Sequence, residues 1–80
     1  MNKEEITGKL QTVFEKVFQE KDLTITREMT AEDIEEWDSL RHIQLMTEGE
    51  MAFGTKFKLR EVLSMRNVGD LIDLIHTKRA

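Results

Sequence analysis

The chain has 80 residues, of which 39% are hydrophobic and 35% charged, with a net charge of −4. A chain of this length forms one domain with a modest core, so we expect a single domain over residues 1–80 and no deep active-site cavity. The balance is typical of a globular domain. The absence of cysteine excludes disulfides and thiolate zinc sites. The negative charge argues against nucleic acid as the main partner.

Apolar runs are no longer than two or three residues, too short to cross a membrane. The first residues, Met-Asn-Lys-Glu-Glu, lack the apolar centre of a signal peptide. We therefore expect a cytoplasmic protein with no membrane partner.

Charge is unevenly distributed along the chain. Residues 28–38 contain six acidic side chains and no basic one, and residues 54–66 contain four basic side chains against one acid. These are either two solvated surface stretches or a polar surface that orients partners.

The first predicted helix lies near the N-terminus. Its apolar residues recur at helical spacing and form one stripe that we assign to the core: Ile6, Leu10, Val13, Phe14, Val17 and Phe18. From about residue 19 to 37 this period breaks. We expect a long loop pinned to the core by Ile25, Met29 and Ile34, with one short helical turn started by the capping-box sequence at 30–33.

Asp38 is a favourable N-cap for a second helix. This helix should end near Phe53, with Gly54 as a left-handed C-cap. Residues 59–65 suit a short helix, and Asn67 is expected to start a last one. Val68, Leu71, Ile72 and Ile75 follow in this helix at helical spacing. The fold class is all-α, a small four-helix bundle of three principal helices and one short helix.

The second helix has two apolar sides. One suits the core and contains Ile43, Leu45, Met46, Gly49 and Phe53. The other contains Leu40, Thr47 and Met51, bordered by Arg41, Gln44 and Glu48. We expect this second strip to be exposed and to bind a partner; alternatively, Leu40 and Met51 pack under the loop.

Residues 37–40, Trp-Asp-Ser-Leu, resemble the modification motif of acyl carrier proteins, in which Asp-Ser-Leu opens a helix after a long loop. Residues 43–57 resemble the second helix of this family and the turn after it, and residues 68–75 resemble its last helix. The resemblance covers nearly the whole chain.

The resemblance implies that Ser39 bears a phosphopantetheine arm derived from coenzyme A. A phosphopantetheinyl transferase would attach it, and Asp38 would help to engage that enzyme and its metal. The implied protein is not an enzyme but a carrier, expected to be a monomer. It would receive acyl groups from a loading synthetase or transferase and deliver them as thioesters to acyl-using enzymes of lipid, polyketide or related biosynthesis. A helix N-terminus suits the phosphodiester, because its free N–H groups and dipole favour an anion.

Two other interpretations stay open at this point. A peptidyl or aminoacyl carrier shares the fold and the arm, and an unmodified helical interaction domain would use only the Leu40–Met51 strip. Metal and hydrolase chemistry are disfavoured. His42 and His76 lie in different predicted helices without a ligand cluster, and His42 beside Ser39 has no evident orienting acid or oxyanion loop.

Four positions depart from the family pattern. Arg41 and Gln44 stand where acids are common, which indicates a specialised carrier with dedicated partners. Gly49 stands where the family has a bulky aliphatic residue. The glycine reflects close helix packing, neutral drift or a larger pocket for the acyl chain. Trp37 replaces a small residue, and we expect it to clamp the loop onto the core; alternatively, it shapes the surface that a transferase meets.

Overall fold

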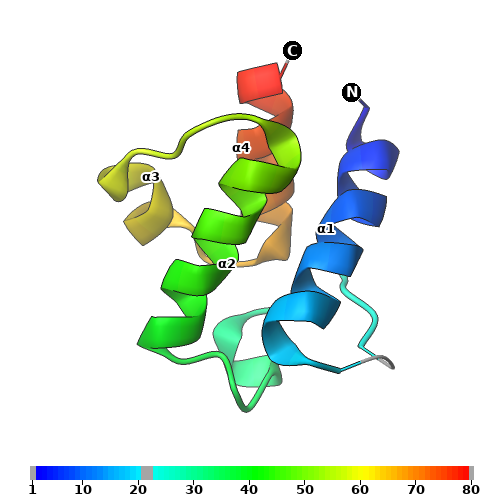
Figure 1. Cartoon of the computed structure of the whole chain (residues 1–80), viewed down its shortest axis with the longest axis vertical. Helices are drawn as coiled ribbons and strands as arrows, with labels where there is room; N and C mark the ends of the chain where they lie inside the picture. Colours follow the sequence, from blue (N-terminus) through cyan, green and yellow to red (C-terminus); the bar gives the residue numbers. More distant parts are fainter. Residues whose placement is uncertain (1, 21–22, 80) are drawn as a thin grey trace.

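The computed structural model describes residues 2–20 and 23–79, although the side chain of Arg79 is not described. It contains four α-helices and one short 3₁₀ turn, and no strand occurs in the described part: α1 Lys3–Phe18, η1 Ala31–Asp33, α2 Ser39–Phe53, α3 Leu59–Ser64 and α4 Val68–Arg79. The predicted fold class is confirmed. Helix α1 packs against both α2 and α4, and α3 stands at the side of α2 (Figure 1). No helix of the described residues is long and apolar enough to cross a membrane.

The helix boundaries follow from local capping. Asn2 caps α1 by accepting the backbone N–H of Glu5 at 2.8 Å. Gly54 ends α2 in the left-handed conformation, with φ 62° and ψ 39°, and Asn67 accepts the backbone N–H of Asp70 at the start of α4. These caps satisfy backbone groups that have no partner inside the helix.

The core forms around α1. All six residues of its predicted stripe are buried, as are the four predicted for α4 and, from the loop, Ile25 and Ile34. Met29 packs on the core while half-buried. Four of the five predicted core residues of α2 are buried, but Ile43 is 62% exposed. That prediction was wrong because Ile43 lies one helical turn after Ser39 and shares its outward face.

The loop between α1 and α2 is attached to the start of α4. The carbonyls of Met29 and Arg27 each accept a backbone N–H, from Val68 and Gly69, both at 2.9 Å. The Arg27 guanidinium also makes a two-point contact with Asp73, at 2.9 and 3.1 Å. Residues 21–22 of the predicted loop lie outside the described residues.

We predict that Gly69→Ala weakens this attachment. A Cβ at residue 69 would lie 3.1 Å from the Arg27 carbonyl oxygen and 3.2 Å from the Arg27 Cβ, so the loop must shift. We expect a loss of about 1–2 kcal/mol in the free energy of unfolding, measured with urea. Gly8→Ala is the matched control, because a Cβ there meets nothing within 4 Å; it should stabilise α1 by up to about 1 kcal/mol. Equal effects of the two substitutions would contradict the close contact.

Asp73 should make stability depend on pH. Its contact with Arg27, and then with Lys3, lowers the pKa of Asp73 from 3.8 to about 2. Because the folded-state pKa is depressed, the stabilisation is complete above pH 3.8 and is lost as the pH falls through about 2. Asp73→Asn should therefore cost up to about 1 kcal/mol at neutral pH, since the side chains are largely exposed, and progressively less towards pH 2. Urea unfolding across this range measures the difference, and a gap that stays constant would contradict the ion pairs.

Candidate functional site

The site is built on the turn that leads into α2. The N–H of Trp37 donates to the carbonyl of Ile34 at 3.0 Å, which brings the chain round to the helix start. Asp38 then caps α2: its Oδ1 accepts the N–H of Arg41 at 2.8 Å. Ser39 is therefore the first residue of the helix, and it is exposed. A hydroxyl at this place is open to another enzyme and stands where the helix favours an anion.

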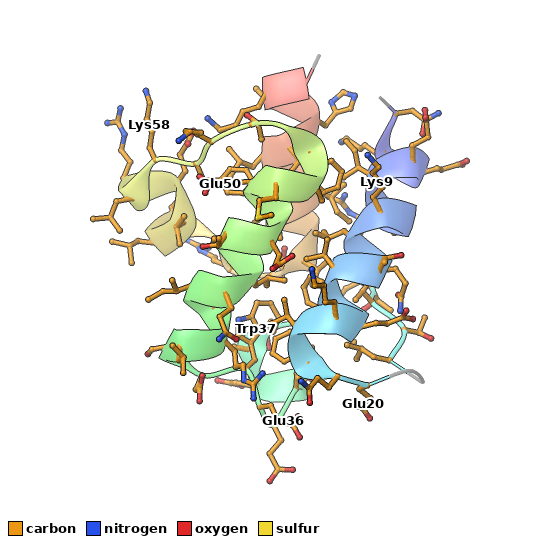
Figure 2. All side chains as sticks on the ribbon, viewed as in Figure 1. Lys9, Glu20, Glu36, Trp37, Glu50 and Lys58 are labelled. Carbon is orange, nitrogen blue, oxygen red and sulfur yellow. The ribbon has the colours of Figure 1, made fainter. Side chains whose placement is uncertain are left out.

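Trp37 anchors this turn in the core. Its side chain is only 7% exposed, and Figure 2 shows it between the start of α2 and the last turns of α1, whereas Glu36 points outward. The ring meets Phe14 edge-on at 5.4 Å and lies 5.8 Å from Phe18. The expectation that Trp37 clamps the loop onto the core agrees with these contacts.

An apolar groove of about 500 Å³ begins at Ser39 and runs between α2 and α3. Its lining comes from three segments of the chain: Ala31, Trp37, Asp38, Ser39, His42, Ile43, Leu59, Val62 and Leu63. Helix α3 buries none of its residues, and Leu59 and Leu63 are each 73% exposed. The groove therefore offers exposed apolar surface beside Ser39.

Helix α3 is held in place at two points. Glu50 on α2 accepts the backbone N–H of Phe57 at 2.8 Å, and Lys78 on α4 pairs with Glu61 at 3.0 Å. The pKa of the Glu61 carboxyl is lowered, first by the N–H of Lys58 and then by Lys78. Within the described residues, these contacts leave Leu59 and Leu63 of α3 exposed beside the groove.

Most of the groove was not predicted from the sequence. Ile43 was expected in the core, and no residue of α3 was singled out. The spacing of Ile43 four residues after Ser39 could have revealed its position. The i, i+4 pair of Leu59 and Leu63 was a weaker signal, because the same pattern is typical of a buried helix face.

The predicted partner strip divides into two groups. Leu40 and Met51 are 63% and 72% exposed, and Gln44 and Thr47 are also exposed, so this part does not pack under the loop. Two charged residues make contacts inside the chain instead. The Arg41 guanidinium donates to the carbonyl of Val17 at 2.8 Å, and Glu48 pairs with Lys16 at 3.0 Å.

The remaining sequence candidates are also placed. Gly49 does not line the groove; a Cβ at this position would make an ordinary contact with the ring of Phe57 at 3.5 Å. His42 is half-buried beside Trp37, whose indole N–H donates to the imidazole at 3.0 Å. The described residues contain no cluster of three potential metal ligands.

Comparison with known proteins agrees with this arrangement. The chain is similar to the solution structure of a holo acyl carrier protein from Geobacter metallireducens, with 40% sequence identity and a TM-score of 0.85. The match covers 90% of this chain and 83% of that one. The chain belongs to the acyl carrier protein family. No family model matches it, and no curated protein does.

In this acyl carrier protein, Arg41 has a structural role that we predict to be measurable. Arg41→Met keeps the aliphatic stem but removes the donors to Val17. Because an unmade hydrogen bond leaves a carbonyl of α1 without its partner, we expect a loss of about 1 kcal/mol in unfolding free energy. Gln44→Met, at an exposed position of the same helix, is the control and should change little. If both variants unfold alike in urea, Arg41 does not hold α1.

Proposed function

We propose that Ser39 of this carrier is the attachment point of phosphopantetheine and that the groove between α2 and α3 receives the arm. The observation that carries the proposal is the exposed Ser39 at the first position of α2, at the end of an apolar groove. The arm supplies a terminal thiol, which a chain without cysteine lacks and which forms thioesters with acyl groups.

The residues present fit this group. Ser39 provides the hydroxyl, and the start of α2 provides backbone N–H groups for the phosphodiester. Ile43, Leu59 and Leu63 provide apolar contact for the chain beyond it. On transfer, a bond forms between the Ser39 oxygen and the phosphorus next to pantetheine in coenzyme A. The pyrophosphate bond breaks, adenosine bisphosphate leaves, and the transferase accepts the serine proton.

Asp38 is proposed to contribute to recognition by the transferase. It is exposed and adjoins Ser39, and its hydrogen bond to Arg41 fixes its side chain. The chain itself performs no catalysis in this proposal, because the transferase activates the serine and partner enzymes transform the acyl group.

Partner enzymes are proposed to recognise the strip of Leu40, Gln44, Thr47 and Met51 beside Ser39. Basic residues lie at the other side of the groove, where Lys58 precedes α3 (Figure 2). Acidic residues such as Glu36 precede α2. A partner would therefore meet an apolar centre between a negative and a positive edge, an arrangement that sets its orientation. A monomeric carrier in the cytoplasm suits these encounters.

We predict that a broad-specificity phosphopantetheinyl transferase, with coenzyme A and magnesium, adds one phosphopantetheine to the purified protein. Intact mass and peptide mapping should place it on Ser39. Ser39→Ala should abolish the gain completely, whereas Ser64→Ala should not affect it. Ser64 is a suitable control because it is exposed and is the second of the chain's two serines. Modification of the Ser39→Ala variant would contradict the proposal. So would a folded wild-type protein that stays unmodified while a control carrier in the same assay is modified.

A further inference from the structure

Two polar groups lie in the apolar groove beside Ser39, and they are bonded to each other. The Nε1 of Trp37 is 3.0 Å from the Nδ1 of His42, and the two ring planes are inclined by 24°. Trp37 is buried against α1, whereas His42 is half-buried on the first turn of α2. The pair therefore joins the core to the helix that presents the serine.

This contact fixes the form of the imidazole. The indole N–H is a donor only, so Nδ1 of His42 must accept and carries no proton. In a neutral imidazole the proton then lies on Nε2, because the partner of one ring nitrogen determines the state of the other. The contact with Trp37 thus determines that Nε2 is the nitrogen of neutral His42 that can donate a hydrogen bond.

The Nε2 donor is available to a ligand. The two imidazole nitrogens point in widely different directions, so with Nδ1 turned to the buried indole, Nε2 points away from it. No hydrogen bond of Nε2 occurs within residues 2–20 and 23–79. Those residues also contain no buried polar side-chain atom lacking a partner, so Nε2 reaches solvent.

The helical spacing of His42 and Ser39 places their side chains near each other. Residues three apart on a helix have Cβ atoms about 5–6 Å from each other, a separation that a phosphoryl group and an imidazole can span. Arg41, the nearest cation in sequence, is directed to Val17 instead. His42 is thus a side-chain donor that lines the groove and lies near Ser39 in the sequence.

We propose that His42 is a positioning residue, whose Nε2 donates a hydrogen bond to a phosphodiester oxygen of the arm. Trp37 holds the imidazole of His42 in the tautomer that this hydrogen bond requires. The inference rests on the proposed attachment at Ser39. One hydrogen bond at the root of the arm would favour directions that lead into the groove, while the helix N-terminus provides the other contacts of the phosphate.

The tautomer is tested first on the unmodified protein, so this part does not depend on the arm. Nitrogen NMR of the labelled imidazoles should show that neutral His42 carries its proton on Nε2. Trp37→Phe, which removes the indole donor, should give a mixture of both tautomers. A proton on Nδ1 in the wild type would overturn the inference.

The hydrogen bond is tested on the modified protein, after intact mass has verified attachment. Phosphorus NMR should show a shifted phosphodiester resonance in His42→Leu relative to the wild type. Exchange of the Nε2 proton with water should also slow when the arm is present. His76→Leu, which changes the other histidine of the chain, is the control and should leave the resonance unchanged. An identical phosphorus resonance in the His42→Leu variant and the wild type would overturn the proposal, whereas a lack of mass gain would instead refute attachment at Ser39.

Discussion

The packing of Trp37 is the constraint on which the site depends. This residue joins three parts of the chain: the aromatic pair Phe14 and Phe18 on α1, the loop before α2, and His42 on α2. An aromatic side chain of this size contributes a large buried area together with one polar handle. Because Trp37 precedes Asp38 and Ser39 directly, fixing its ring fixes the end of the loop and the first turn of the helix. The serine is thereby exposed on a rigid support.

The charged side chains of α2 are engaged in contacts within the protein. Arg41, Glu48 and Glu50 are the three charged residues of the helix, and each makes a contact inside the chain. The surface that α2 offers beside Ser39 is therefore mainly apolar and neutral. Arg41 and Gln44 therefore differ in their surroundings: Arg41 bonds to the carbonyl of Val17 on α1, whereas Gln44 lies in the exposed strip.

Much of the fold could be predicted because it is encoded locally. The stripe of α1, the cap at Asp38 and the C-cap at Gly54 each depend on residues a few positions apart, and all three agree with the structure. The groove could not be predicted in the same way. Its exposure depends on how far α3 stands from α2, which no local pattern specifies. Ile43 was misplaced for a different reason, because its position one helical turn after the exposed Ser39 was not taken into account. The contact of Trp37 with His42 was also hidden, since it joins a loop residue to a helix without helical spacing.

The most direct test of this account compares the backbone amide and indole NMR spectrum before and after an acyl-bearing arm is attached. The account predicts that changes concentrate at the groove, including the single tryptophan N–H of Trp37 and the amides of Ile43, Val62 and Leu63. Residues that do not line the groove, such as Thr7 near the start of α1, should change little. Changes restricted to the immediate neighbours of Ser39, or spread evenly over the bundle, would contradict it.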